Sequence, residues 1–101
     1  MAMCADGLAK LLEEMGELAQ VCAKKLAYFD TDEHPDGSSL KQRMESEMGD
    51  VLAAINFVIF QFKLDGHEIR ARSTEKLHLF NKWHAQTDND QGFLSKQAGE
   101  A

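Results

Sequence analysis

Apolar residues recur at steps of three and four along the first part of the chain. They are Leu8, Leu11, Leu12, Met15, Leu18, Cys22 and Leu26. At 100° per residue this spacing gives a helix one apolar face, so we predict a helix over residues 6–28 with Asp6 as its cap. The segment 29–39 then collects the chain's one proline, a glycine and several Asp and Ser residues, and is predicted to be a loop.

A second helix is predicted from Ser38 or Ser39, either of which can cap it, to about Leu64, where an Asp-Gly pair ends it. Its first half is amphipathic, but residues 51–62 are apolar nearly all round. A helix of that kind is enclosed by neighbours on more than one side. A third, shorter helix is predicted over residues 67–85.

These elements predict an all-α fold, because the chain shows no β pattern and no internal repeat. We expect a helical bundle of two long antiparallel helices plus a shorter third. Three helices in one chain cannot cover the central one on all sides, so we expect oligomerisation of identical chains to complete the bundle. The domain is predicted to span residues 1–86, followed by a flexible C-terminal tail, 87–101, with few apolar anchors.

Composition and charge narrow the possible functions. The 101 residues include 17 acidic against 11 basic side chains, with a net charge of −6 and no basic cluster, so nucleic acid is not an expected partner. The most apolar stretch is shorter than the roughly 20 residues that a membrane span needs. Cys4 and Cys22 have no paired spacing, and the N-terminus has no secretory signal pattern, so we expect a cytoplasmic protein.

Two acidic couplets carry the candidate chemistry. Glu14 and Glu17 lie three residues apart on the first predicted helix, as do Glu47 and Asp50 on the second. Residues at this spacing share one face, and antiparallel helices can bring the two couplets together. Glu47 falls inside the apolar arc of its helix, where an uncompensated carboxylate is strongly disfavoured. Protonation, a basic partner or a divalent cation can neutralise such a cluster, and hard oxygen ligands suit Mg²⁺ or Mn²⁺.

A simpler interpretation is that the first couplet and Glu13 are solvated or pair with Lys10 and Lys24. Gly16 and Gly49, one inside each couplet, each cost about 1 kcal/mol in a helix interior. We therefore expect them to allow close approach of the helices beside the ions.

The segments LLEEMGEL (residues 11–18) and ESEMGDVL (residues 45–52) resemble the ExxE and ExxD motifs of the MazG family, the all-α nucleoside triphosphate pyrophosphohydrolases. The resemblance covers roughly residues 7–84. It implies a helical bundle assembled as a homodimer or homotetramer, Mg²⁺ held by the motif carboxylates with Mn²⁺ as a possible substitute, and a nucleoside triphosphate substrate. The implied reaction is attack of a metal-activated water at the α-phosphate, which yields the monophosphate and pyrophosphate.

Carried over by position, the resemblance also assigns residues. The implied metal ligands are Glu14, Glu17, Glu47 and Asp50. The implied catalytic residues are Glu13, Glu14 and Glu47, with Glu13 as an outer ligand or water-orienting group. The expected substrate-binding residues are Lys25, Lys76, Asn81 and Lys82, where Lys25 is a general candidate for added positive charge at the phosphates.

Two other functions remain open at this point. A non-enzymatic helical module could use the acidic face to bind a basic partner, and it would be indifferent to Mg²⁺. A di-iron carboxylate bundle is the less favoured rival, because such sites need two Glu-x-x-His motifs and the chain has one, at residues 75–78. The base and sugar preference of an enzyme is not encoded in these motifs.

Overall fold

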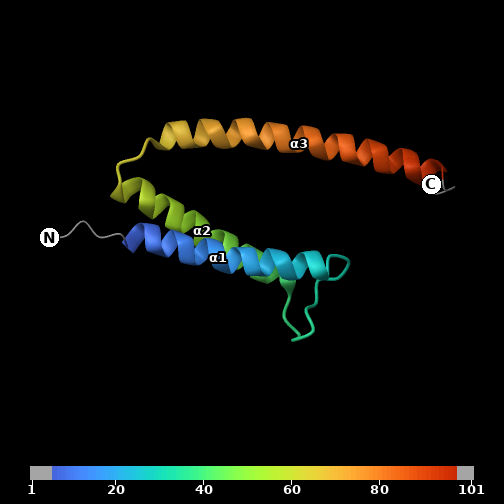
Figure 1. Cartoon of the computed structure of the whole chain (residues 1–101), viewed down its shortest axis with the longest axis horizontal. Coiled ribbons are helices and arrows are strands. Elements are labelled where there is room, and N and C mark those ends of the chain that lie inside the picture. The colour runs from blue at the N-terminus through green and yellow to red at the C-terminus, as the bar shows by residue number, and fades with distance from the viewer. Residues whose placement is uncertain (1–5, 98–101) are drawn as a thin grey trace. The chain divides into compact units, whose positions relative to one another are not determined.

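The structure is a computed structural model that describes the backbone of residues 6–97 and the side chains of residues 6–87. Within that range the chain forms three helices and no strand, which confirms the all-α class (Figure 1). The helices are α1 (Asp6–Ala27), α2 (Leu40–Gln61) and α3 (Gly66–Gln97). The chain divides into two compact units, Met1–Leu64 and Asp65–Ala101.

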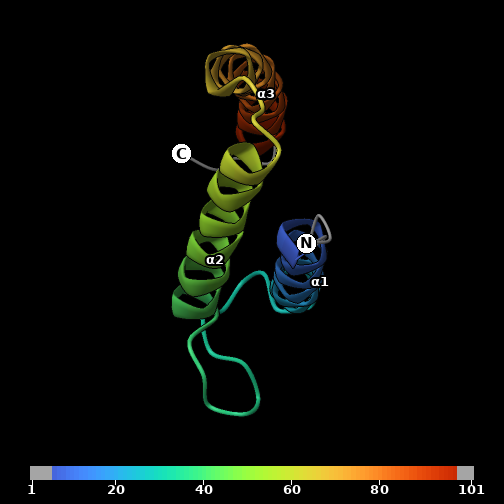
Figure 2. The same ribbon diagram turned by 90° about the vertical axis from the view of Figure 1, so that its left-hand side faces the viewer.

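The first unit is an antiparallel hairpin in which α1 and α2 lie side by side, as both views show (Figures 1 and 2). The positions of low exposure follow steps of four and three on each helix. On α1 they include Gly7, Leu11, Glu14, Leu18 and Val21, and on α2 they include Leu40, Met44, Glu47, Val51, Ala54 and Val58. This alternation is the spacing that keeps one stripe of a helix against a neighbour. We call the contact between the two stripes the seam.

The seam of α1 is shifted by one residue from the apolar face that the sequence predicted. Leu8, Leu12, Met15 and Leu26 are exposed in this chain, and Leu12 keeps 69% of its accessible surface. The helix therefore has two neighbouring stripes, of which the less apolar one, containing Glu14, faces α2. Exposed large side chains continue on α2, and we call the combined surface the outer apolar face. It comprises Leu8, Leu12, Met15, Leu26, Met48 and Leu52.

Hydrogen bonds fix the hairpin at its open end. The backbone N–H of Gly7, in the first turn of α1, donates to Oε1 of Gln61, the last residue of α2, at 3.0 Å. A side chain at position 7 would collide with the Gln61 amide, so the absence of a Cβ permits this contact. An N–H in the first helical turn has no partner within its own helix, and Gln61 supplies one.

The loop end is fixed by Asp32 and Ser39. Asp32 accepts hydrogen bonds from the Lys41 N–H at 2.7 Å and from the Ser39 hydroxyl at 2.7 Å. Ser39 in turn caps α2 by accepting from the Gln42 N–H at 3.2 Å, which confirms it as one of the two predicted caps. These bonds lower the pKa of Asp32, chiefly through the Ser39 hydroxyl. The predicted loop is thus an ordered connection that also starts α2.

Helix α3 is longer than the predicted third helix. It has 32 residues against the 22 of each earlier helix, and the Asp65 carboxylate caps it by accepting from the N–H groups of His67 and Glu68. No Pro interrupts this segment, and the helix continues through Gly92 to Gln97. Residues 87–97 of the predicted tail are therefore helical, its remaining residues 98–101 lie outside the described range, and its flexibility stays a prediction.

The described helices and cysteine bear on the expectations about a membrane span and a disulfide. No helix in the described part of the chain has both the length and the hydropathy to cross a bilayer. Cys22 is a free thiol in a half-buried position. Cys4 and the chain start, from which the lack of a secretory signal was inferred, lie outside the described residues.

Candidate metal centre

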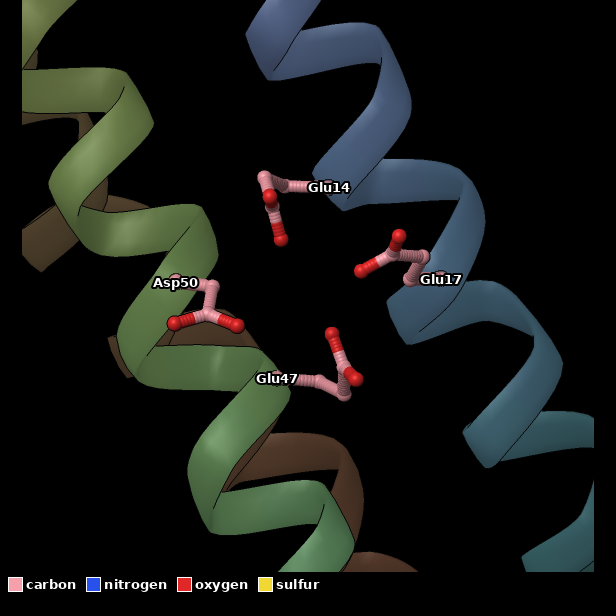
Figure 3. Close-up of side chains that lie close together, drawn as sticks. All are labelled: Glu14, Glu17, Glu47 and Asp50. Atoms are coloured by element: carbon pink, nitrogen blue, oxygen red, sulfur yellow. The ribbon is translucent and has the colours of Figure 1, made fainter.

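The two acidic couplets meet in the middle of the hairpin (Figure 3). Glu14 and Glu17 project from α1, and Glu47 and Asp50 project from α2. One carboxylate oxygen from each of the four residues lies within 4.8 Å of the others. The three-residue spacing places both members of a couplet on one face, and the antiparallel pairing sets that face opposite the second couplet.

The four carboxylates differ in exposure. Glu14 and Glu47 belong to the seam and are half-buried, whereas Glu17 and Asp50 are exposed. The Oε2 atoms of Glu14 and Glu47 are hidden from solvent and have no hydrogen-bond partner. Buried polar atoms in proteins are nearly always paired, so two such atoms at one spot indicate a missing partner.

The pKa values of the two half-buried carboxylates also indicate that the cluster lacks a positively charged partner. Burial raises the pKa of Glu14, and the nearby Glu17 and Asp50 carboxylates raise it further. Burial is also the main cause of a raised pKa at Glu47, again reinforced by Glu17 and Asp50. Among residues 6–87, no ion pair joins any of the four to a Lys or Arg. The ionised cluster is therefore unfavourable without a cation.

The chemistry of the donor set fits a hard divalent ion. All four donors are carboxylates, and the cluster contains no Cys or His. Oxygen-only sites of this kind suit Mg²⁺ and Mn²⁺, and an ion would give the two orphaned oxygens their missing partner. The residues present are therefore compatible with a bound metal.

Glu13, the first of the doubled glutamates, lies outside this cluster. Its Oε2 atom pairs with Nζ of Lys10 at 3.2 Å on the exposed surface of α1. This pair agrees with the simpler interpretation for Glu13, in which Glu13 is solvated or pairs with Lys10. The outer-ligand or water-orienting role of Glu13 stays a prediction.

The expected substrate-binding residues are divided between the two units of the chain. Lys25 donates from Nζ to the Thr31 carbonyl at 2.8 Å and so contacts the loop. The other three lie on α3 in the second unit, with Lys76 half-buried and Asn81 and Lys82 exposed. Their role in binding substrate stays a prediction.

The expectation for the couplet glycines was wrong within this chain. A Cβ added at Gly16 or Gly49 would meet no other heavy atom of the described structure within 4 Å. Both glycines are exposed and lie off the seam, so α1 and α2 do not approach each other there. The glycine that permits a close contact between these helices is Gly7, which the sequence pattern did not single out.

A cavity next to the carboxylates contains residues that the sequence analysis did not select for binding. It has a volume of about 310 Å³. It is lined by Lys10, Glu14, Asp50, Ala53, Ala54 and Phe57. Lys10 precedes Glu14 by four residues, a spacing that places both on one helix face and that could have identified it. Phe57 could not be found in this way, because its position depends on the register of the two helices.

A comparison with models of protein families gives a match that covers most of the chain. A family model described as the MazG nucleotide pyrophosphohydrolase domain matches residues 6–82. The matched range includes all four clustered carboxylates as well as Lys76, Asn81 and Lys82. Searches of curated proteins and of solved structures give no match.

Proposed function

We propose, from the premise that this chain belongs to the MazG nucleotide pyrophosphohydrolase family, that it is a Mg²⁺-dependent enzyme acting on a nucleoside triphosphate. In the proposed reaction a water oxygen bonds to the α-phosphorus, and the bond from that phosphorus to the bridging oxygen of the β-phosphate breaks. The products are the nucleoside monophosphate and pyrophosphate. The observation that carries the proposal is the meeting of four carboxylates with two orphaned buried oxygens.

In this proposal the clustered carboxylates hold the metal. Bound Mg²⁺ supplies charge neutralisation at the phosphates and lowers the pKa of a water molecule. Glu14 and Glu47 lie in the seam and would bind the ion from its buried side. Glu17 and Asp50 are exposed and would bind it from the side that a substrate can reach. Glu13 is assigned the outer position, where it orients the attacking water.

Substrate recognition needs positive charge, because both the triphosphate and the protein are anionic. We assign this role to Lys25 and to the α3 residues Lys76, Asn81 and Lys82. Ammonium and amide groups donate hydrogen bonds to phosphate oxygens, and the ammonium groups add charge.

The proposal includes a homodimer or homotetramer. The outer apolar face supports it, since Leu12 keeps 69% of its accessible surface and Leu52 keeps 61%. Contiguous apolar surfaces of this kind are uncommon on small monomers. A Leu52→Glu variant is expected to dissociate in sedimentation analysis, and an unchanged assembly would contradict the use of this face.

The deciding experiment measures pyrophosphate release from a panel of ribo- and deoxyribonucleoside triphosphates with and without Mg²⁺. We expect Mg²⁺-dependent release that is lost in Glu14→Gln, Glu47→Gln and Asp50→Asn while circular dichroism shows unchanged helix content. Glu45→Gln is the matched control, because Glu45 is exposed on α2 and lies outside the cluster. Full activity in the three cluster variants would refute the assignment of these ligands.

The same measurements separate the enzyme from an acidic interaction module. A module would release no pyrophosphate from any substrate, and its thermal stability would not respond to Mg²⁺ with a nucleotide. The enzyme is expected to be stabilised by that combination, since ligands that bind only the folded state raise the melting temperature.

A further inference from the structure

The cavity between α1 and α2 holds a basic and an aromatic side chain that the proposed reaction has not used. Six residues line it, and two of them, Glu14 and Asp50, also belong to the candidate metal centre. The cavity and the metal centre are therefore continuous. Its volume of about 310 Å³ is at the lower end of the range for small-molecule sites.

We propose that this cavity is the nucleotide subsite beside the metal centre, with Lys10 binding a substrate phosphate and Phe57 contacting the nucleoside. The inference rests on the proposed function and adds two residues to it. Neither Lys10 nor Phe57 is among the substrate-binding residues assigned above.

Helix geometry places the two groups at different distances from the metal centre. Lys10 is one turn from Glu14, about 6 Å along the axis of α1, and Phe57 is two turns from Asp50, about 10 Å along α2. A phosphate next to the bound ion is within reach of a long lysine side chain. The base and sugar extend further from the ion, in the direction of Phe57.

Charge favours Lys10 for the phosphate. It is the one cationic side chain among the cavity residues. Its present partner is Glu13, on the same helix three residues away, and both side chains are more than half exposed. Exposed pairs of this kind are weak, so the ammonium group can exchange Glu13 for a phosphate oxygen.

The far wall favours a nucleoside. Ala53 and Ala54 have small side chains, and Ala54 is buried with 4% of its surface accessible, so it forms a closed floor. Phe57 beside them keeps 49% of its surface, which leaves part of its ring available for contact. Aromatic rings stack on bases with little dependence on sequence, so this wall suits a nucleoside of any base.

The test measures binding without turnover. The dissociation constant of a non-hydrolysable α,β-methylene nucleoside triphosphate is determined by calorimetry with Mg²⁺, and that of pyrophosphate is determined in the same way. We expect Lys10→Met to weaken both ligands by about tenfold, which corresponds to about 1.4 kcal/mol. Lys10→Arg should recover most of the affinity. Phe57→Ala should weaken the nucleotide analogue by about tenfold and leave pyrophosphate within twofold of wild type.

Two control variants remove a lysine and a phenylalanine side chain that lie outside the cavity. Lys41→Met deletes an exposed lysine in the first turn of α2, and Phe29→Ala deletes a 74% exposed ring in the loop. Both should bind the analogue as wild type does. Wild-type affinity in Lys10→Met and Phe57→Ala would overturn the inference, and so would a failure of wild type to bind the analogue. Binding that is weakened as expected in Lys10→Met and Phe57→Ala, without pyrophosphate release by wild type, would instead refute the proposed reaction while supporting the subsite.

Discussion

We expect the Glu47→Gln variant to be more stable than wild type without Mg²⁺ and less stable than wild type with Mg²⁺. The change removes one charge from the cluster and keeps the shape of the side chain. In metal-free buffer we expect Glu47→Gln to melt at a higher temperature than wild type. A neutral amide is cheaper to bury than a carboxylate, and its NH₂ group can donate to the neighbouring Glu17 or Asp50 oxygens.

With Mg²⁺ the order should invert, because the variant keeps only three of the four carboxylate ligands. At a Mg²⁺ concentration of 100 times the wild-type dissociation constant, binding stabilises the folded state by about 2.7 kcal/mol. If loss of the half-buried ligand weakens binding about 100-fold, the variant gains only about 0.4 kcal/mol under the same conditions. For a domain of this size, the difference of about 2.3 kcal/mol corresponds to roughly 9–18 °C in melting temperature.

The assay is differential scanning calorimetry of both proteins in EDTA and across a Mg²⁺ titration, at one fixed protein concentration. Glu45→Gln is measured beside them and should follow wild type throughout, since Glu45 is exposed and outside the cluster. Two results would refute the reasoning. One is a variant less stable than wild type in EDTA, and the other is an equal Mg²⁺-induced shift in both proteins.

Three further predictions follow from the same contacts. Folding raises the pKa of Glu14 and Glu47 above the ordinary value of 4.5, so the metal-free folded state binds more protons than the unfolded state. Urea unfolding should therefore show stability falling as pH rises above about 4.5, and the double variant Glu14→Gln/Glu47→Gln should lose this slope; an unchanged slope would contradict the assignment. Folding lowers the pKa of Asp32, so its contribution should be complete above 3.8 and decline in more acidic buffer, and an Asp32→Asn variant should lack that decline. Ser39→Ala removes the α2 cap and should cost about 1 kcal/mol in urea unfolding, whereas Ser46→Ala, on the exposed surface of α2, should cost little; equal losses would argue against the cap.

Much of the candidate site could be predicted from the sequence, because each pair of carboxylates lies within one turn of a single helix. The spacing of Glu14 to Glu17 and of Glu47 to Asp50 places each couplet on one helix face, whatever else the chain does. The loop with its single proline ends the first helix and allows the second to fold back along it. Together these features bring the couplets into reach, and the structure shows their oxygens within 4.8 Å.

The rotation of α1 could not be predicted from its own periodicity. The sequence contains two apolar stripes offset by one residue, and the more apolar one, with Leu8 and Leu12, is exposed. The stripe with Glu14 faces α2 instead. Hydrophobic periodicity identifies candidate faces, but the choice between adjacent faces depends on the other surfaces that each can cover.

The remaining differences between prediction and structure concern features that no local sequence motif encodes. Phe57 lies in the cavity beside Lys10 because of how α2 is aligned against α1, and no local motif carries that alignment. The couplet glycines appeared to be contact positions, but they lie off the seam. The length of α3 exceeded the prediction because its C-terminal half is polar and has no apolar pattern, so periodicity gives no signal there.

The hydrogen bond from Gly7 to Gln61 limits how the hairpin can respond to repulsion at its centre. Because this bond joins the first turn of α1 to the last residue of α2, sliding the helices past each other by one residue would break it. The Oε2 atoms of Glu14 and Glu47 are hidden from solvent, so water does not hydrate these two oxygens. The hairpin is thereby preorganised for a counter-ion, and substitution of Gly7 should weaken metal affinity from a distance without removing any ligand.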